Sequence, residues 1–412
     1  MQPKRILIIG LVWPEPTSSA AGTRMIQLIN LFLATGFEVI FASAASKSDF
    51  SFDLKNIGVS ERHIKLNDEQ FDVFLREINP AIVLFDRFMV EEQYGWRVQQ
   101  ECPGAFKVLD TEDLHTLRLA RQEQVKKGSA EALNLFTDMA KREIAAILRC
   151  DLSLIISEVE LNILLNQFKI DPSLMYYLPF LEEEITAKTI QNWETFEARE
   201  GFAFIGNFLH EPNWHTVQFL KTQIWPQLRK KIPQASMNIY GAYPSQKVLQ
   251  LNNRQEKFHV HGRAEDARTT LSKHKILLAP IQFGAGVKGK FVDAMHTGTP
   301  AVTTSIGAEA MKGDLNWNGF IENEPEHFIQ KAVELYQNKN IWLEAQQNGI
   351  KLLNEHYGKE KFESLFINKL QSLMLNLNQH REHNFMGQIL QHHSLQSTKY
   401  MSLWIAEKNK HQ

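Results

Sequence analysis

Two lysines, Lys288 and Lys290, stand at the end of the glycine-rich segment FGAGVKGK, residues 283–290. The apolar run at residues 276–279 that precedes this segment is typical of a buried strand, a helix is predicted to start at about residue 289, and a second strand is predicted at residues 301–304. The N-terminus of such a helix presents backbone N–H groups and the positive end of the helix dipole, and the two lysines add formal charge. The segment is therefore predicted to bind an anion, best matched by a phosphate.

Two other interpretations of this segment remain open. The glycines can simply shape a turn, with both lysines solvated, as lysines commonly are. The letters from Gly284 to Lys290 also spell GxxxxGK, the beginning of a P-loop. A P-loop needs Ser or Thr at the next position to hold Mg²⁺, and this chain has Phe291 there. A Mg-dependent P-loop-like NTPase is therefore the weaker alternative.

The elements that must position this segment alternate between strand and helix along most of the chain. This pattern predicts an α/β fold whose parallel sheets are covered on both faces. We expect an N-terminal Rossmann-like domain at residues 1–180, an acidic linker at 181–200, a second Rossmann-like domain at 201–377, and a helical tail at 378–412. Strands are predicted at residues 5–10, 39–42, 81–85, 106–109, 152–156, 175–178, 202–207, 237–240, 258–260, 276–279 and 301–304.

The loop after the first predicted strand, residues 11–23, is long, and such loops commonly carry ligands in α/β sheets. It lacks GxGxxG, so a nicotinamide or flavin dinucleotide site is not indicated. A helix is predicted from Arg24 onward. Ser157 followed by Glu160 predicts a capping box at the start of a later helix.

The totals for the chain exclude several classes of protein. A formal net charge of -2 over 412 residues gives no basic footprint for nucleic acid, so none is expected as a partner. Cys102 and Cys150 are the only cysteines, and neither a disulfide framework nor a zinc site is expected. No stretch approaches the length of apolar sequence that crosses a bilayer. We expect a cytoplasmic protein. The apolar helical tail also allows docking at the inner face of a membrane, although packing against the first domain is the expectation for it.

The layout of two Rossmann-like domains, one linker and a phosphate loop in the second domain resembles the GT-B glycosyltransferases. The resemblance is sharpest to the retaining family 4 group, which includes bacterial enzymes of cell-surface polysaccharide synthesis. It is carried by FIGNFLHEPNWHTVQFL (204–220), FHVHGRAED (258–266) and the stretch APIQFGAGVKGKFVDAMHTGTPAVTTSIGAEAM (279–311). The segment KVLDTEDLHTLRLAR (107–121) looks like a first-domain segment of such enzymes, and the match is looser there.

The resemblance implies roles for the residues of the second-domain loop. Asp293 stands where these enzymes have the second glutamate of a paired signature, and it would bind the ribose hydroxyls of the donor. The first glutamate of that signature falls at Ala285, so the backbone N–H groups of Ala285, Gly286 and Val287 would contact the donor sugar instead. Lys288 would bind the diphosphate, with Lys290 as a second ligand or a structural neighbour.

The resemblance extends these roles to other donor-side residues. Relatives carry an Arg and a Lys after the first strand of the second domain, whereas Asn207 and its neighbours up to residue 214 supply neither. Arg263 would line the nucleotide base, and Glu309 would meet the ribose or the donor sugar, unless it only complements a helix dipole. Gly22 would let the first domain's backbone approach the diphosphate.

His115, which follows Asp110, Glu112 and Asp113, is the candidate on the acceptor side. It would orient the donor sugar or a hydroxyl nucleophile, and the alternative is a structural histidine with a satisfied hydrogen bond. Retention of anomeric configuration rests on the resemblance, and a general base among the three carboxylates would allow inversion instead.

The sequence thus predicts transfer of a sugar from a nucleoside-diphosphate sugar to a glycan, lipid-linked or protein acceptor, with His115 and Lys288 as the catalytic residues. No cofactor and no obligatory metal are expected, because Lys288 and the helix N-terminus can stabilise the leaving phosphate. A catalytically silent nucleotide-sugar-binding protein is a further alternative. The sequence leaves the oligomeric state open.

Overall fold

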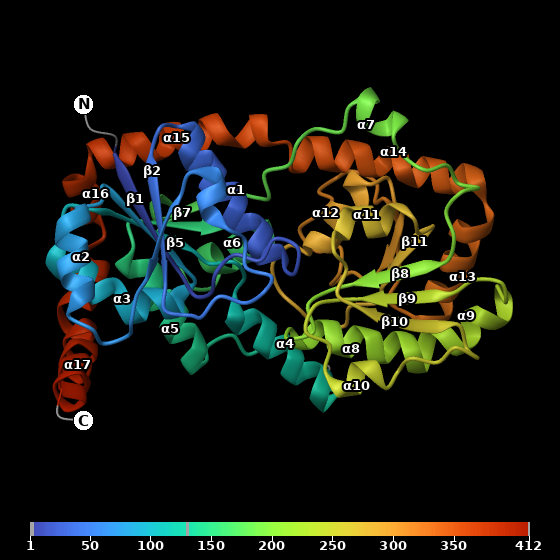
Figure 1. Ribbon diagram of the computed structural model, residues 1–412, viewed down its shortest axis with the longest axis horizontal. Helices are drawn as coiled ribbons and strands as arrows, with labels where there is room; N and C mark the ends of the chain where they lie inside the picture. The colour runs from blue at the N-terminus through green and yellow to red at the C-terminus, as the bar shows by residue number, and fades with distance from the viewer. Residues whose placement is uncertain (1–3, 129–131, 411–412) are drawn as a thin grey trace.

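The computed structural model describes residues 4–128 and 132–410. The predicted start of the first domain, at residue 1, and the predicted end of the tail, at residue 412, lie outside the described residues. Two α/β domains lie side by side, with their sheets at opposite ends of the molecule (Figure 1). Both sheets are parallel, as predicted, and both follow the strand order of a Rossmann fold.

The first sheet has the order β3-β2-β1-β4-β5-β6-β7. Its predicted strands are confirmed to within one residue at most ends. The exception is β3, whose sequence SERH has no apolar residue, because it is an edge strand with little burial. The strands are β1 (Arg5–Gly10), β2 (Glu38–Ser43), β3 (Ser60–His63), β4 (Ile82–Asp86), β5 (Phe106–Asp110), β6 (Leu152–Ile155) and β7 (Met175–Tyr177).

The second sheet has the order β10-β9-β8-β11-β12-β13. The five predicted strands are present, and the sequence did not reveal β13, a short, half-buried edge strand. The strands are β8 (Phe202–Ile205), β9 (Met237–Tyr240), β10 (Phe258–Gly262), β11 (Ile276–Ala279), β12 (Ala301–Thr303) and β13 (Gly319–Ile321).

Helices cover both faces of each sheet (Figure 1). Those of the first domain are α1 (Ala20–Ala34), α2 (Gln70–Ile78), α3 (Phe88–Glu101), α4 (His115–Lys127), α5 (Asp138–Arg149) and α6 (Glu158–Asn166), with 3₁₀ turns at Leu54–Ile57 and Pro172–Leu174. After the linker helix α7 (Ala187–Gln191), the second domain has α8 (Glu211–Phe219), a π-helical turn (Leu220–Ile224), α9 (Trp225–Lys231), α10 (Gln246–Leu249), α11 (Ala267–Ser272), α12 (Gly289–His296), α13 (Pro325–Gln337) and α14 (Lys339–His356). The chain ends in α15 (Lys359–Leu375), α16 (Leu377–His383) and α17 (Phe385–Lys410).

The cores follow from the alternation of side chains along each strand. In β1, Leu7 and Ile9 belong to the apolar cluster on one face of the first sheet, and Ile6 and Ile8 belong to the cluster on the other face. Cys102 and the second cysteine, Cys150, are both free and buried, in agreement with the absence of a predicted disulfide.

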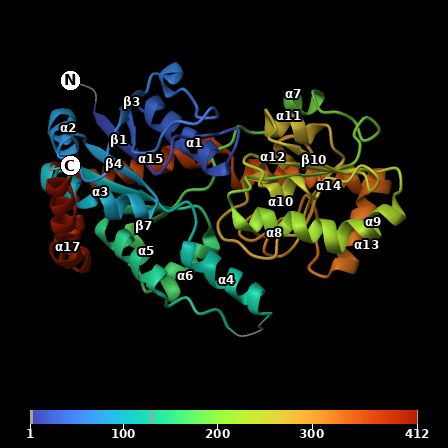
Figure 2. The ribbon, with the colours of Figure 1, turned by 60° about the horizontal axis from the view of Figure 1, so that its bottom comes forward.

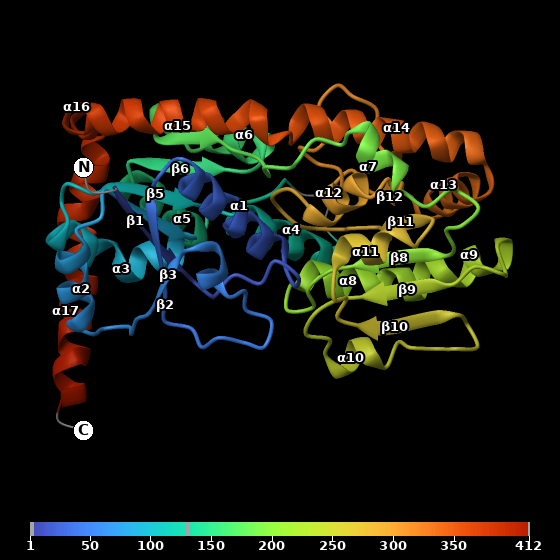
Figure 3. The same cartoon turned by 45° about the horizontal axis from the view of Figure 1, so that its top comes forward.

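The chain crosses between the domains at two points that touch. Glu182 of the linker donates its backbone N–H to Tyr357 O (2.8 Å) and accepts from Lys359 N (2.8 Å), at the break between α14 and α15. Figure 3 shows these two helices following each other across both domains. Phe366 of α15 lies in the core of the first domain. Residues 359–375 therefore pack on the first domain, although the sequence analysis placed them in the second.

The tail returns to the first domain, where α17 lies against α3 and α5. Arg97 of α3 donates to Ser402 Oγ in α17 (3.3 Å). Figures 1 and 3 place α17 at the end of the first domain that is farthest from the second. Among residues 4–128 and 132–410, no helix is long and apolar enough to span a bilayer.

Candidate functional site at the domain interface

The predicted anion site lies at the start of α12. Lys288 is the N-cap residue of the helix, and Gly289 is its first residue, as predicted. No side chain caps this N-terminus, because a lysine can only donate hydrogen bonds. Lys288 Nζ donates to Gly286 O (2.8 Å), and Lys290 Nζ donates to Asn213 Oδ1 (2.7 Å). Two cations and the uncapped N–H groups of a helix therefore share one corner of the second domain.

Burial makes both ammonium groups costly to charge. It lowers the pKa of Lys288 to about 8, an effect that Glu309 partly opposes. Burial together with the nearby Lys288 lowers the pKa of Lys290 to about 7. A bound anion would restore the pKa of both groups, because an opposite charge at close range favours the ammonium form.

An arginine of the first domain reaches into this loop. Arg121, from α4, donates to Gly284 O (2.8 Å) and forms a two-pronged ion pair with Glu309 (2.7 and 2.6 Å). Both side chains are largely buried. Figures 1 and 2 show α4 extending from the first domain to α8 of the second. Glu309 is therefore held beside the glycine-rich loop by a residue of the first domain.

A carboxylate of the first domain also contacts the loop. Glu160 Oε1 accepts from Gly286 N (2.7 Å) and from Leu114 N (3.0 Å). Gly286 has a φ of +63°, and a Cβ atom there would lie 3.0 Å from Asp113 Cβ, so glycine allows this approach. The predicted capping box is half correct: Ser157 Oγ accepts from Glu160 N, but the Glu160 side chain turns to the domain interface instead of back to its own helix.

His115 is the first residue of α4, and its Nε2 lies 3.5 Å from Asp113 Oδ1. Asp113 also pairs with Arg118. Burial lowers the pKa of His115 to about 4. Desolvation at the interface also lowers the pKa of His210, although that residue is more exposed. Asp113 and His115 both act electrostatically on His210, which precedes α8 of the second domain. Two neutral imidazoles, one from each domain, thus lie at the interface.

The other two acidic residues at the end of β5, Asp110 and Glu112, differ in burial and in their contacts. Asp110 is fully buried and pairs with Arg24 of α1 (2.9 Å). Glu112 has a φ of +61°, and burial and Asp110 raise its pKa to about 8. Arg87, at the end of β4, also has a positive φ of +73°. Non-glycine residues in this conformation concentrate at functional sites, where the surrounding structure holds them.

Asp293 lies on α12 beside the linker and not at the lysine cluster. Arg268 Nε donates to Asp293 Oδ1 (2.8 Å), and its Nη2 donates to Glu182 Oε2 (2.7 Å). The carboxylate predicted to bind ribose therefore has an arginine partner here. A carboxylate has further lone pairs that remain available to hydroxyl groups.

Three other predicted donor residues, Arg263, Asn207 and Gly22, make contacts outside the lysine cluster. Arg263 donates to Thr17 Oγ1 (2.6 Å) in the loop after β1, so it bridges the domains. The Asn207 side chain accepts from Leu209 N (2.9 Å), which shapes the turn after β8. Gly22 lies inside α1, which starts at Ala20 and not at Arg24 as predicted, and its N–H donates to Ser19 Oγ (3.0 Å).

The need for glycine at position 22 is steric. A Cβ atom there would meet the backbone of Glu15 at 2.4 Å. The N–H group that was expected to approach a diphosphate thus serves the N-cap of α1. The N-termini of α1 and α12 do meet, because a Cβ atom at Gly289 would lie 2.6 Å from Ala20 Cβ.

The structure brings together Lys288, Lys290, Gly286, Glu309 and His115 at one part of the interface, while Asp293 and Arg263 lie on other parts of it. Sequence reasoning assigned no role to Arg121 and read Glu160 as a helix cap. Arg121 lies in the segment that carried the first-domain resemblance, and its position there was the available signal.

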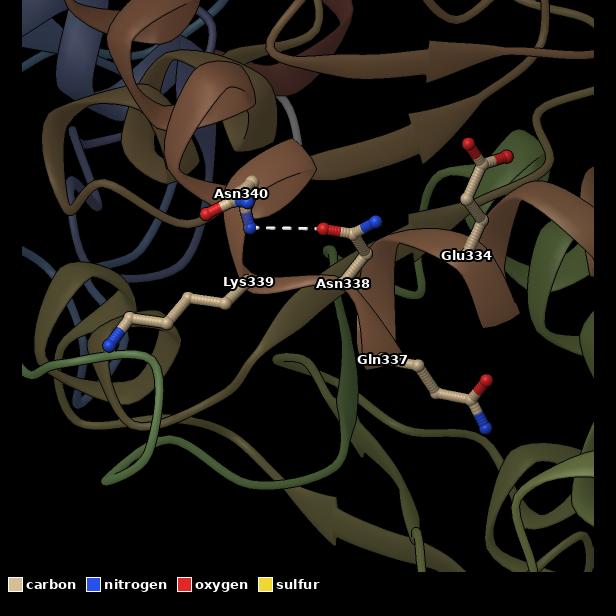
Figure 4. A pocket seen from close by; sticks show the side chains of 5 residues that line it. All are labelled: Glu334, Gln337, Asn338, Lys339 and Asn340. Atoms are coloured by element: carbon tan, nitrogen blue, oxygen red, sulfur yellow. Dashed lines mark hydrogen bonds between the residues drawn. The ribbon is translucent and has the colours of Figure 1, made fainter.

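Two hollows lie on the surface away from the lysine cluster. One, of about 460 Å³, lies at the turn between α13 and α14 (Figure 4), where Asn340 N donates to Asn338 Oδ1 (3.0 Å). The other, of about 360 Å³, lies between the linker helix and α11 and includes Arg268. In the described part of the chain, no group of three or more His, Cys, Asp or Glu residues is arranged to hold a metal ion.

The fold is similar to that of several solved glycosyltransferases. TarM from S. aureus superposes with a TM-score of 0.68 at 12% identity, over 90% of this chain and 99% of that one. The pneumococcal O-GlcNAc transferase GtfA, in complex with UDP and GlcNAc, gives 0.66 at 11% identity, over 91% and 100%. HepE from Anabaena, in complex with UDP-glucose, gives 0.64 at 12% identity, over 90% and 100%. These likenesses show the fold.

The sequence comparison adds the family of the second domain. Residues 199–338 match the family described as group 1 glycosyl transferases. The chain has the GT-B fold, and its second domain is a group 1 glycosyltransferase domain. No curated protein matches it in sequence. The matched range contains the whole lysine-bearing loop of the glycosyltransferase, whereas Arg121, His115 and Glu160 lie outside it.

Proposed function

We propose that this glycosyltransferase moves a sugar from a nucleoside-diphosphate sugar to a hydroxyl acceptor, with the donor diphosphate at the N-terminus of α12. The observation that carries the proposal is the pair of half-buried lysines, Lys288 and Lys290, beside an uncapped helix N-terminus. A nucleoside diphosphate leaves as an anion, and fixed positive groups in a site that excludes water stabilise that charge most effectively.

The lysines take the place of the basic residues that relatives carry after the first strand of the second domain. Lys290 Nζ binds Asn213 Oδ1, in the segment where that charge is missing, and it lies 4.9 Å from the ring centre of Phe204 in β8. Lys290 thereby brings an ammonium group from α12 to that segment. We assign Lys288 and Lys290 together as the diphosphate ligands.

The proposed donor is a UDP-sugar. GtfA and HepE, which share the fold, are described in complex with UDP or UDP-glucose. The base would lie near Arg263 after β10, and the ribose near Asp293, whose carboxylate Arg268 orients through Oδ1. Glu309, held by Arg121, would accept hydrogen bonds from the donor sugar in place of the glutamate that is absent at Ala285.

On the acceptor side, the groups favour a mechanism without a protein general base. Asp110 and Asp113 are paired with Arg24 and Arg118, and burial raises the pKa of Glu112 to about 8, which keeps that carboxyl protonated at neutral pH. Retention of anomeric configuration is therefore proposed, with His115 orienting a hydroxyl group. NMR of the anomeric proton in the first-formed product tests the stereochemistry.

The diphosphate is proposed to need no obligatory metal ion, because the two lysines supply its charge. The competing NTPase interpretation requires a small hydroxyl residue after Lys290, and Phe291 is instead a core residue whose ring packs 5.3 Å from that of Trp317. A silent binding protein would bind the donor without turnover, so turnover itself separates that alternative.

Thermal unfolding with UDP, GDP, ADP and ATP, each in EDTA and then in Mg²⁺, tests the proposal. A ligand at a hundred times its dissociation constant stabilises the native state by roughly 2.7 kcal/mol. A shift with UDP in EDTA is expected. A shift confined to Mg-ATP would instead support the NTPase, and release of sugar from UDP-glucose or UDP-GlcNAc would exclude the silent protein.

The role proposed for the enzyme is synthesis of a cell-surface glycan at the cytoplasmic face of a membrane, with a glycan, lipid-linked or protein acceptor. The tail helix supports the location. Phe385, Ile389, Tyr400 and Trp404 are exposed and share one side of α17 at about 3.6 residues per turn, and the opposite side packs on the first domain. Lysines at positions 399 and 408 border the exposed apolar side, an arrangement typical of helices that lie in an anionic membrane interface.

Flotation of the protein with vesicles of phosphatidylglycerol and phosphatidylethanolamine tests this location. Binding is expected, and it should fall in Tyr400→Ser/Trp404→Ser, whereas Leu66→Ser, a change at an exposed apolar residue elsewhere, should have no effect. Failure to float, or a dimer in light scattering that the double substitution dissociates, would contradict membrane docking.

A further inference from the structure

Glu160, a residue of the first domain, links its own helix to two other segments, one in each domain. Its side chain belongs to α6, and Oε1 accepts from Leu114 N at the start of α4 and from Gly286 N across the interface. The residue is completely buried, and its other oxygen, Oε2, has no hydrogen-bond partner. A buried carboxylate oxygen without a partner is costly and calls for an explanation.

The N–H group that Glu160 binds belongs to the loop assigned to the donor. Gly286 N is one of the backbone donors of that loop, and Lys288 Nζ binds the carbonyl oxygen of the same residue. A carboxyl group of the first domain thus occupies a hydrogen bond that a donor anion would use. An ionised Glu160 and a diphosphate at the same loop would repel each other.

Building on the proposed function, we propose that Glu160 is a donor-diphosphate ligand that must carry a proton for the donor to bind, and that it then releases Gly286 N. The proton comes from solvent and attaches to the carboxylate, and no covalent bond is otherwise formed or broken. A protonated carboxyl is a hydrogen-bond donor, so the group changes from a competitor of the phosphate to a partner of it. The N–H of Gly286 then becomes available to the phosphate.

The surroundings of Glu160 favour this proton uptake. Burial and the nearby Asp113 raise its pKa to about 8, against the opposing effects of its two N–H bonds and of Lys288. Asp113 is itself paired with Arg118 and lies near His115 and His210, and burial keeps both imidazoles neutral at neutral pH. Loss of the Gly286 N–H bond and approach of a phosphate would both raise the pKa of Glu160 further.

A matched control residue lies in the adjacent helix. Glu143 of α5 is also a buried carboxylate that accepts two backbone N–H bonds, from His115 (2.7 Å) and Thr116 (2.8 Å). Burial raises its pKa to about 7. Both of its hydrogen bonds lie within the first domain, so its protonation should not be linked to the donor loop.

The test is calorimetric titration of UDP into wild type, Glu160→Gln and Glu143→Gln from pH 6.5 to pH 9. Glutamine imitates the protonated carboxyl, so Glu160→Gln should bind UDP like wild type at pH 6.5. At pH 9 the variant should bind roughly tenfold more tightly than wild type, because only about a tenth of wild-type molecules then carry the proton. Lys288 and Lys290 titrate in both proteins; Glu160 raises the pKa of Lys288, so loss of its charge in the variant lowers that pKa and works against the expected gain at pH 9. Glu143→Gln should follow wild type.

A wild-type to Glu160→Gln affinity ratio that stays constant with pH would overturn the inference while leaving the proposed function intact. Absence of UDP, GDP and ADP binding to wild type at every pH would overturn both. If Glu160→Gln unfolds, the test is the number of protons taken up on UDP binding at pH 9, compared between wild type and Glu160→Leu in buffers of different ionisation enthalpy. Glu160→Leu, which also lacks the charge, should take up about one proton fewer than wild type in the same titrations.

Discussion

The two sheets share one strand order, but different residues follow their strands at the domain interface. Carboxylates stand at the ends of the first-domain strands, and lysines follow a strand of the second domain. Asp86 and Asp110 are the last residues of β4 and β5, and Glu112 and Asp113 follow directly. The loop after β11 leads to Lys288 and Lys290. In open α/β sheets, ligands bind beyond the carboxyl ends of the strands. Topology therefore fixes where each domain offers a site, and the loop residues decide which chemistry it performs.

The two sides of the interface are suited to different parts of the proposed reaction. The basic loop is suited to the leaving diphosphate, and the acidic wall, whose aspartates are neutralised by arginines, is suited to hydroxyl groups. The two walls are also joined directly, by Arg121 with Glu309 and by Glu160 with Gly286. Single substitutions can break each of these contacts separately, so the role of each side of the interface can be tested on its own.

The largest effect is expected from the basic wall, the second-domain side of the interface that carries Lys288 and Lys290. Lys288→Ala removes a fixed charge beside the leaving phosphate and should lower kcat for a UDP-sugar by roughly 10²–10³-fold, the range for loss of one group that stabilises transition-state charge. Circular dichroism should show an unchanged fold. Lys331→Ala, on the outer surface of α13, serves as the control and should retain full activity. Near-normal turnover in Lys288→Ala would refute the phosphate assignment.

The next effect concerns the contact between the walls. Arg121→Ala leaves Glu309 without its partner in a largely buried position, which should cost about 3 kcal/mol in unfolding free energy or in domain closure. Small-angle scattering separates these outcomes, because an opened interface enlarges the molecule before it unfolds. Lys339→Ala breaks the exposed pair with Glu197 and should change stability by less than about 0.5 kcal/mol. Equal effects of the two substitutions would show that the Arg121 contact is incidental.

A smaller effect is expected from Asp293, an acidic residue of α12. Asp293→Asn should weaken UDP binding by about tenfold, or 1.4 kcal/mol, if its carboxylate accepts from the ribose. With 2′,3′-dideoxy-UDP, the variant and wild type should bind equally. Arg268→Gln controls for loss of the ion pair. If Asp293→Asn reduces the affinity for both nucleotides alike, the ribose assignment fails.

The same contrast explains what the sequence could and could not predict. Most strands were predictable because their apolar runs are uninterrupted, and the basic wall was predictable because Lys288, Lys290 and their helix lie in one short segment. The acidic wall depends on tertiary approach: Arg121 is 163 residues from Gly284, and Glu160 is 126 residues from Gly286. No local pattern encodes such contacts. Glu160 even satisfies the pattern of a helix cap, and only the domain arrangement shows where its side chain goes.

The smallest effect is expected from His115 on the acceptor wall. Burial lowers its pKa to about 4 from an ordinary value near 6.5, so the imidazole is neutral throughout the range from pH 6 to pH 8. His115→Asn should therefore lower kcat by about fivefold, the cost of one orienting hydrogen bond near 1 kcal/mol, without changing the shape of the pH profile in that range.

The same pKa shift predicts an effect on stability. The histidine binds a proton near pH 6.5 in the unfolded chain but only near pH 4 in the native protein, so wild type should lose more stability than His115→Asn as the pH falls between these values. A kinetic limb between pH 6 and pH 8 that disappears in the variant would instead make His115 a titrating base, and the acceptor wall would then take part in proton transfer.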